Sequence, residues 1–309
     1  MKLDRFNVYK IISAVLICFV IAFSFSVMAT SDFGGTFGWN EIFDFVDLSN
    51  KRSDKLSFVR FVDVGEADCS IIYSNGEVAI IDSGSNSDDG AFIARYLRKN
   101  KITNIKYLIA THPHNDHIGG MPMILNFLEV ENLIFAETET QSQVDRVASK
   151  NLLNSALENE VPIITPLVGQ KFEVGDFSLQ IICFLSDELD ENDRSLVVLS
   201  ECEGVKLIFT GDAGKPVEQY LVANGVDVSA DVIKIAHHGS KYATNIRFLE
   251  EVNPKYALIS CGLDNSYSHP SEDLLFRLNN KGVEVYRTDI NGDVTFYVLE
   301  GEIKIETER

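Results

Sequence analysis

His112-Pro113-His114-Asn115-Asp116-His117 is the stretch that says most about this chain, and it directly follows an apolar run at residues 105–111. The run predicts a buried strand. Side chains alternate along extended backbone, so we expect His112 and His114 on one face. If a helix begins just beyond them, Asp116 and His117 face a second point nearby. Two imidazoles, and a carboxylate paired with an imidazole, suit two divalent ions, because neutral imidazole is the commonest metal ligand. The stretch therefore predicts a metal site rather than a loop that happens to be rich in histidine.

Composition sets the outer bounds. The chain has 309 residues, of which 45% are hydrophobic, so it can bury a sizeable core. Its formal net charge of −19 argues against a general phosphate-binding surface. It does not exclude a nucleic-acid or phosphate substrate, because bound cations reverse the local sign. Five cysteines without a Cys-x-x-Cys spacing predict buried thiols rather than a disulfide framework.

The beginning of the chain reads as a targeting segment. Residues 11–29 carry no charged side chain and follow Lys2, Arg5 and Lys10. As a helix this run spans roughly 28 Å, close to the hydrocarbon thickness of a bilayer. The basic flank predicts that the remainder lies outside the cytoplasm. We expect residues 1–30 to be either a cleaved signal peptide or a retained membrane anchor. The alternative without a targeting role is a buried helix of a soluble domain.

Beyond this segment we expect a linker at residues 31–54 and one domain at residues 55–309. Strands are predicted to alternate with helices throughout that domain. The predicted strands cover residues 57–64, 69–73, 78–82, 105–111, 177–184, 195–201, 205–210, 232–236, 256–260, 283–287, 294–299 and 303–306. The predicted helices cover residues 88–99, 119–128, 141–159, 215–224 and 271–281.

Further polar residues follow predicted strands, where a site would gather them. Asp212 ends the apolar run at residues 207–210, and its two oxygens suit a bridge between two ions. Ordinary Gly-Asp turn chemistry explains the same pattern equally well. His237 and His238 follow another apolar run, but adjacent side chains in extended backbone point to opposite faces. At most one of the two should therefore bind a metal. His269 lies in a loop, either as a surface histidine or as a proton donor or phosphate contact.

These residues resemble the metallo-β-lactamase superfamily, and in particular the branch found in the hydrolase domain of ComEC-type DNA-uptake proteins. Besides the histidine-rich stretch, the segments that match this branch in order are residues 61–68, 80–82, 209–212, 235–240 and 266–271. The resemblance covers roughly residues 57–299. It implies an α/β fold, a four-layer αβ/βα sandwich, with metals at one edge of two facing sheets.

The resemblance also implies roles for individual residues. His112 and His114 would bind a first ion. A second ion would take Asp116, His117 and one of His237 or His238, with a slight preference for His238. Asp212 would bridge the two ions, and Asp82 would support the ligands from behind.

Two departures from the family pattern stand out. No histidine occurs between residues 118 and 211, where the superfamily often supplies a further ligand to the first ion. Asn192, Asp193 or water would complete that site instead. Glu66 and Ala67 also replace the usual Gln-Gly pair, which leaves substrate contacts there open.

The expected cofactors are two divalent ions, Zn²⁺ or Mn²⁺, which activate a shared water. Asp116 would hold this water and accept part of its proton, and His269 would protonate the leaving oxygen. The leading functional hypothesis is an extracytoplasmic phosphodiesterase acting on nucleic acid or on a phosphorylated envelope component. Two alternatives stand beside it, namely a carboxylic ester, lactone or β-lactam hydrolase, and a surface-anchored binding module with a vestigial site. The expected membrane contact is the N-terminal segment alone, and the sequence does not predict an oligomeric state.

Overall fold

The computed structural model describes residues 56–136, 138, 140–185 and 190–309. The predicted leader at residues 1–30 and the linker at residues 31–54 lie outside this range, and their assignment stays a prediction. Within the described range, no helix is long and apolar enough to cross a membrane.

Two mixed sheets form the centre of the domain. The first has the strand order β17-β16-β1-β2-β3-β5-β7-β8. Its members are β1 (Ser57–Phe61), β2 (Ser70–Ser74), β3 (Glu77–Ile81), β5 (Tyr107–Ile109), β7 (Leu133–Ile134), β8 (Ile163–Ile164), β16 (Val294–Leu299) and β17 (Glu302–Thr307). Antiparallel pairing joins β17 through β3, and parallel pairing continues from β3 to β8. The C-terminal strands therefore complete a sheet that the N-terminal half begins.

The second sheet has the order β15-β14-β13-β12-β11-β10-β9. Its members are β9 (Lys171–Val174), β10 (Phe177–Cys183), β11 (Val197–Cys202), β12 (Val205–Phe209), β13 (Val232–Lys234), β14 (Tyr256–Ile259) and β15 (Glu284–Arg287). Strands β9 through β12 pair antiparallel, whereas β12 through β15 run parallel. Parallel strands present their carboxyl ends at one edge, and the segments after β12 and β13 meet there.

The two sheets face each other across an apolar core that includes Phe61, Phe177, Phe209 and Phe296. Phe61 lies against Phe209 with ring centroids 5.9 Å apart, which joins the first sheet to the second. Alternation along each strand places the remaining apolar side chains on the outer faces, where helices cover them.

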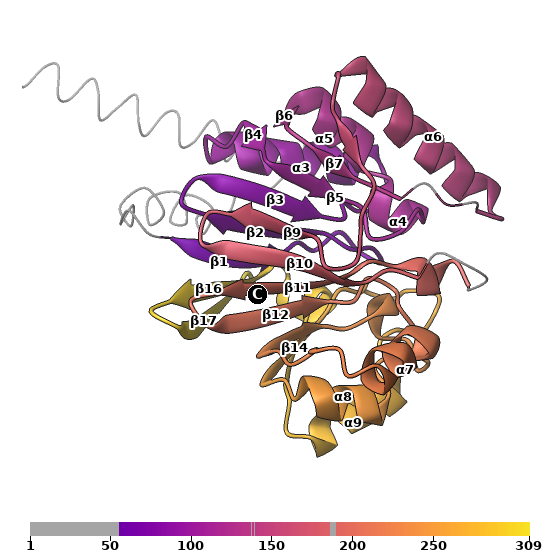
Figure 1. The fold of residues 1–309 in the computed structure, drawn as a ribbon, viewed down its shortest axis with the longest axis vertical. Helices are drawn as coiled ribbons and strands as arrows, with labels where there is room; N and C mark the ends of the chain where they lie inside the picture. Colours follow the sequence, from indigo (N-terminus) through magenta and orange to yellow (C-terminus); the bar gives the residue numbers. More distant parts are fainter. Residues whose placement is uncertain (1–55, 137, 139, 186–189) are drawn as a thin grey trace, which may run out of the picture. The chain divides into compact units, whose positions relative to one another are not determined.

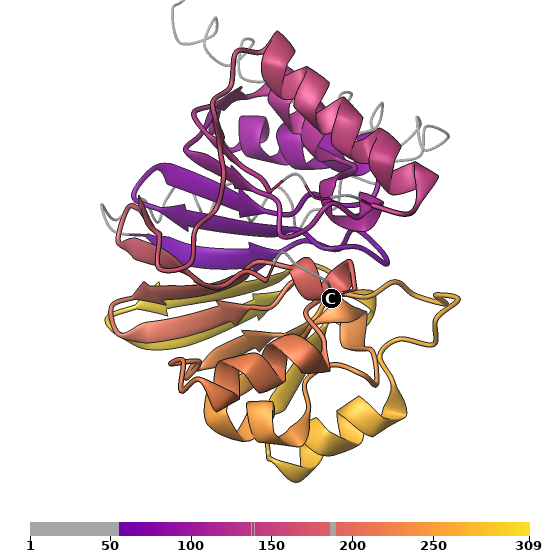
Figure 2. The same cartoon turned by 45° about the vertical axis from the view of Figure 1, so that its right-hand side comes forward.

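Helices form the two outer layers (Figures 1 and 2). The first sheet is covered by α3 (Ser87–Lys99), α5 (Met121–Phe127) and α6 (Gln143–Glu158), and the second by α7 (Lys215–Ala223), α8 (Ile246–Val252) and α9 (Glu272–Asn280). The remaining elements are short: α4 (Asn115–Ile118), α10 (Thr288–Asn291), the 3₁₀ turns η1 (Asn192–Arg194) and η2 (His237–Gly239), and a small pair of β4 (Asn104–Ile105) with β6 (Glu129–Val130). The predicted four-layer αβ/βα sandwich is confirmed.

Some predicted elements differ from the observed ones. The predicted strand at residues 105–111 changes partner at Lys106, so that Ile105 pairs with Val130 whereas Leu108 pairs with Ile80. The short helix α8 and the short strands β7, β8 and β9 were not predicted, because each is too short for a clear period. The prediction of buried thiols is confirmed for the described cysteines, which are free and buried: Cys69, Cys183, Cys202 and Cys261.

Candidate metal centre

The histidine-rich stretch crosses from a strand end into a single helical turn. β5 ends at Ile109, and α4 begins at Asn115 with His114 in extended conformation before it. His112 therefore lies in the bend between β5 and α4, whereas Asp116 and His117 lie on the helix. His112 and His117 are buried, while the side chains of His114 and Asp116 keep 21% and 34% of their surface exposed. The partly exposed pair marks the side of the centre that is open to solvent.

Close backbone packing holds this turn in place. A Cβ on Gly120, just after α4, would lie 2.1 Å from the carbonyl oxygen of Ser83 and 2.9 Å from the amide nitrogen of Gly90. Only glycine allows such an approach of α4 to the segment between β3 and α3. The packing brings α4 beside Asp82, the first residue after β3.

Asp212 reaches the same point from the second sheet. The chain turns sharply after β12, with Gly211 at a φ of +50°, where a Cβ would lie 2.9 Å from the Ser195 side chain. The amide of Asp212 donates a hydrogen bond to Ser195 Oγ at 3.0 Å, which fixes the carboxylate above the sheet edge. The Gly-Asp turn thus places a buried carboxylate against the histidines instead of leaving it on the surface.

Asp212 lies between two groups of potential ligands. Its Oδ1 is 3.2 Å from Nε2 of His117, and its Oδ2 is 3.9 Å from Nε2 of His112. One group, whose ligand atoms all lie within 4.8 Å of one another, contains Asp116, His117, Asp212 and His238. A second group of the same compactness contains His112, His114 and Asp212. The shared carboxylate has the arrangement that a bridging ligand requires.

Several of these atoms are buried without a hydrogen-bond partner. They are Nε2 of His112, Nε2 of His117 and Oδ1 of Asp212. An unsatisfied buried polar atom costs free energy, so three of them converging in one place indicate a missing ligand. Imidazole and carboxylate donors at this spacing fit divalent metal ions. Two further groups within the described residues, Asp68 with Asp82 and His117, and His114 with Asp145 and Glu191, are of similar compactness.

Neighbouring groups fix the ring orientations of two histidines. His117 Nδ1 lies 2.8 Å from Oδ2 of Asp82, and His238 Nδ1 lies 3.0 Å from the carbonyl oxygen of Ser260. Because both acceptors lack a hydrogen, Nδ1 is the donor in each case, which leaves Nε2 facing the centre. Orientation of ligating histidines by such partners is typical of metal sites.

The geometry separates His237 from His238. His238 is buried, and its Nε2 lies 3.2 Å from Oδ2 of Asp116. The His237 ring is tilted by 79° relative to that of His238, at a centroid distance of 6.3 Å, and belongs to none of the compact groups. Both residues have a φ of +51°, so the alternation assumed for extended backbone does not apply here. The structure therefore places His238, and not His237, among the potential ligands.

His269 lies beside the centre rather than on the open surface. Its ring centroid is 5.7 Å from that of His237 and 6.4 Å from that of His238. Nδ1 of His269 lies 2.8 Å from Oε1 of Glu66, whose Oε2 accepts the amide of Gly262 at 2.7 Å. Glu66, one of the two departures from the family pattern, thus orients His269.

The region opposite His114 contains a residue that the sequence did not single out. Oε2 of Glu191 lies 3.0 Å from Nε2 of His114. Asp193 instead accepts the amide of Gly214 through Oδ1 at 2.8 Å, and neither Asn192 nor Asp193 belongs to a compact ligand group in the described part of the chain. Glu191 is 77 residues away from His114 in sequence, and no local pattern connects the two.

The charges of the centre depend on one another. Burial acts to lower the pKa of His238, but Asp212 and Asp116 outweigh it and raise the pKa to about 9. Burial also acts to lower the pKa of His117. The carboxylates of Asp212, Asp82 and Asp116 outweigh this effect and raise that pKa well above its usual value. For Asp212, burial acts to raise the pKa, yet His117 and His238 hold it well below its usual range. In the absence of metal, these imidazoles therefore carry protons where cations would bind.

A buried ion pair lies behind the centre. Lys234 of β13 donates a hydrogen bond to Asp68, and both residues are almost fully buried. Asp68 Oδ1 also lies 3.5 Å from Nδ1 of His238. This lysine offsets part of the negative charge that Asp68, Asp82 and Asp212 bring into the interior.

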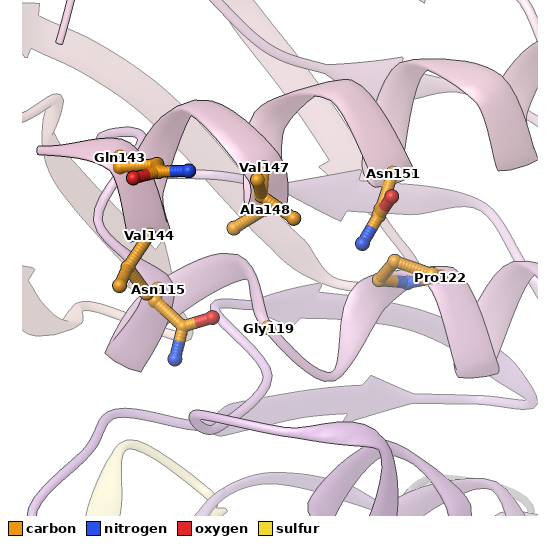
Figure 3. Close-up of a pocket in the computed structure, with 8 residues that line it drawn as sticks. All are labelled: Asn115, Gly119, Pro122, Gln143, Val144, Val147, Ala148 and Asn151. Atoms are coloured by element: carbon orange, nitrogen blue, oxygen red, sulfur yellow. The ribbon is translucent and has the colours of Figure 1, made fainter.

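Two cavities lie near the centre. One, of about 610 Å³, is lined by Asp212 and His237 and extends towards Lys215, Lys241 and Tyr242. The other, of about 360 Å³, lies between α6 and the segment from α4 to α5, where Val144, Val147 and Pro122 line it together with Asn115 (Figure 3). Of these two cavities among the described residues, only the first is lined by a potential ligand, Asp212.

Residues 62–263, well over half of the chain, match the Metallo-beta-lactamase superfamily. The chain belongs to this superfamily. Among its relatives, ComE operon protein 3 of Bacillus subtilis is 32% identical over 202 residues, which make up 65% of this chain and 26% of that protein. Competence protein ComA of Neisseria gonorrhoeae is 34% identical over 39% of this chain and 18% of that protein. Recombination protein 2 of Haemophilus influenzae is 26% identical over 80% of this chain and 30% of that protein.

The chain thus spans less than a third of the length of these relatives. They confirm the resemblance to ComEC-type competence proteins. Among solved structures, CmlA, a diiron β-hydroxylase from Streptomyces venezuelae, has a TM-score of 0.52 at 14% identity and covers 77% of this chain and 53% of that one. Igni18, a metallo hydrolase from Ignicoccus hospitalis, has a TM-score of 0.50 at 13% identity, with 77% and 98% covered. At these identities the likeness shows the fold alone. The superfamily and the ligand groups together indicate a site for divalent metal ions.

Proposed function

We propose that this protein is a phosphodiesterase that uses two divalent ions, Zn²⁺ or Mn²⁺. The observation that carries the proposal is the position of Asp212 between two compact ligand groups. His112, His114 and Asp212 would hold one ion, and Asp116, His117, His238 and Asp212 the other. Such a pair of ions supplies a water whose pKa falls towards about 7 and stabilises the charge that develops on phosphoryl oxygens.

The protein side chains contribute positioning and proton transfer. The pKa of Asp116 lies well below its usual range, because His117 and the hydrogen bond with His238 outweigh the effect of burial. Asp116 is therefore ionised at neutral pH and accepts a hydrogen bond from the attacking water, although it is a weak base. Its partial exposure places it on the side from which a substrate arrives.

His269 is the proposed proton donor to the leaving oxygen. Glu66 holds its Nδ1, so that Nε2 is available on the other side of the ring. An alkoxide leaving group needs such a proton, because it is expelled poorly as an anion. The name of the Bacillus subtilis relative refers to the ComE operon, and that of the Neisseria gonorrhoeae relative to competence, which supports nucleic acid as one candidate substrate. Phosphorylated envelope polymers are the other.

The test compares three chromogenic substrates with the purified protein in the presence of Mn²⁺ or Zn²⁺. We expect turnover of bis(p-nitrophenyl) phosphate and much slower turnover of a lactone and of nitrocefin. Preferred hydrolysis of the lactone or nitrocefin would replace the proposal with a carboxylic ester or β-lactam hydrolase. Inactivity on all three, with no metal detected by elemental analysis, would instead indicate a binding module with a vestigial site.

We further propose an extracytoplasmic location, on the strength of the basic and apolar segment at the beginning of the chain. Protease added to intact cells should degrade the domain if the segment is an anchor, and the domain should appear in the medium if the segment is cleaved. Protection from protease until the cells are lysed would contradict both versions.

A further inference from the structure

The cavity beside the metal centre has a cationic wall that the proposed chemistry does not use. Lys215 begins α7, and Lys241 lies in the loop after η2; both are exposed and line the cavity. Neither ammonium has an ion-pair partner in the described part of the chain, whereas Lys106, Lys206 and Lys281 each pair with a carboxylate. Two lysines without an ion pair among the described residues thus lie on the wall of this cavity, in a chain with a net charge of −19.

The loop that carries Lys241 is held rigidly. Glu218, buried in α7, accepts hydrogen bonds from the amides of Thr244 and Asn245. On the other side, Nη2 of Arg277 in α9 donates to the carbonyl oxygens of Ala243 at 2.9 Å and Lys241 at 3.4 Å. Glu218 and Nη2 of Arg277 therefore anchor the loop, and the exposed cations of the cavity wall are the two lysines.

The same loop presents an aromatic ring to solvent. Tyr242 is 71% exposed and lines the cavity. Nζ of Lys241 lies 5.0 Å from the centroid of this ring, so the charge and the flat surface are adjacent. A cation next to a stacking surface is the combination that binds single-stranded nucleic acids.

Three carboxylates also line the cavity, and their charges oppose an anion. Asp193 is engaged with the amide of Gly214, and Asp190 accepts the amide of Asn192 at 3.1 Å. Asp212 belongs to the metal centre, where bound cations would offset its charge. Once the charge of Asp212 is offset, Lys215, Lys241 and Arg277 outnumber Asp190 and Asp193 in the lining of the cavity.

We propose that this cavity is a subsite for the nucleotide next to the scissile phosphate, with Lys215 and Lys241 on its phosphate and Tyr242 stacked on its base. The inference rests on the proposed phosphodiesterase function and extends it to a substrate longer than one phosphodiester. Asp212 and His237 line the same cavity, so an occupant of the subsite is continuous with the reaction centre.

The test measures binding and turnover separately. Binding of a fluorescein-labelled oligothymidylate is followed by anisotropy on ice with the metal-loaded protein, and turnover is followed with bis(p-nitrophenyl) phosphate, which has no neighbouring phosphate. We expect K215Q and K241Q each to weaken oligothymidylate binding by about tenfold at low salt. Each should also reduce the slope of log Kd against log salt by about 0.7, the value for one phosphate contact of a single strand. The effect on KM for bis(p-nitrophenyl) phosphate should be several times smaller.

Matched variants control for general effects. Lys171 of β9 is exposed, has no ion pair among the described residues and does not line the cavity, so K171Q should bind like the wild type. Y242A should weaken binding by about tenfold, whereas Y242F, which keeps the ring, should not. Unlabelled poly(glycerol phosphate), which lacks bases, should compete poorly with the labelled strand.

The outcomes are distinguishable. Turnover of bis(p-nitrophenyl) phosphate together with unchanged Kd in K215Q and K241Q would overturn the subsite and leave the proposed function intact. The absence of oligothymidylate binding to the wild type would have the same meaning. If poly(glycerol phosphate) competed as well as oligothymidylate at equal phosphate concentration, the proposed stacking of a base on Tyr242 would be wrong. Absence of turnover of bis(p-nitrophenyl) phosphate by the wild type would overturn the proposed function and, with it, the subsite.

Discussion

Asp82 accepts a hydrogen bond from Nδ1 of His117 at 2.8 Å, and both side chains are buried. This contact fixes Nδ1 as the protonated nitrogen and directs Nε2 towards Asp212. Asp82 also accepts the amide and the hydroxyl of Thr111, at 2.9 and 2.8 Å. Both oxygens of this carboxylate are thus engaged, and the orientation of one potential ligand depends on them.

The substitution Asp82→Asn should disturb that orientation without emptying the position. If the side-chain oxygen of the introduced asparagine still accepts the hydrogen bond from the backbone amide of Thr111, its NH₂ group faces His117 Nδ1. Nδ1 must then accept a hydrogen bond, so the proton of the neutral ring moves to Nε2, the atom that would bind the metal. We expect metal affinity to fall by about 10- to 100-fold, as for other residues that orient metal ligands. Chelator competition measures the affinity. Asp227→Asn, on the surface next to Lys206, is the control, and equal affinity in the two variants would contradict the role of Asp82.

Removal of the shared carboxylate should have a larger effect than removal of a ligand from one group. Asp212 belongs to both compact groups, whereas His114 belongs to one of them. We expect Asp212→Ala to lose metal from both positions and His114→Ala from one, with turnover below about 1% of the wild type in each. Elemental analysis and circular dichroism check metal content and folding. Full metal occupancy in Asp212→Ala would count against the bridging assignment.

The two adjacent histidines form a matched pair for substitution. His238 faces Asp116 at 3.2 Å, whereas His237 lies on the wall of the cavity and outside the ligand groups. We expect His238→Ala to lose metal and activity and His237→Ala to retain its metal content. The pair is measured by elemental analysis under identical loading. Metal loss in His237→Ala but not in His238→Ala would reverse the assignment.

Local patterns predict the alternation of strands and helices and the cluster of potential ligands, whereas the four layers and the individual roles followed from the resemblance to the metallo-β-lactamase superfamily. Apolar periodicity located most strands, and the run before His112 marked the sheet edge. The choice between His237 and His238 was not predictable, because both residues adopt a left-handed φ that alternation does not anticipate. Contacts such as Glu191 with His114 and Glu66 with His269 join residues far apart in sequence. Only the packed sheets bring those pairs together.

The described thiols should be chemically silent in the native protein. Burial raises the pKa of Cys183 and Cys202 to about 11 and that of Cys261 to about 12, and the pKa of Cys69 is also raised well above its usual value, chiefly by burial. The thiolate is the reactive form, so these cysteines should not react with Ellman's reagent at pH 8. We expect all cysteines to react after denaturation in guanidinium chloride. Rapid native reaction of a variant that contains only these four would contradict their burial.

Metal binding should become tighter as pH rises. In the metal-free protein, the pKa of His238 is about 9 and that of His117 is also well above 6.5, because the carboxylates of Asp212 and Asp116 outweigh burial. A metal ion binds neutral imidazole, so each ring must first lose a proton. At each pH unit below its raised pKa, each ring lowers the apparent metal affinity by about tenfold, and this loss ends for His238 above about pH 9.

Zn²⁺ competition with a chromophoric chelator between pH 6.5 and 9, corrected for the chelator's own titration, should show a steep rise in affinity. Calorimetry in buffers of different ionisation enthalpy should show release of up to about two protons per chain at pH 7. A flat pH dependence without proton release would mean that the metal binds away from His117 and His238.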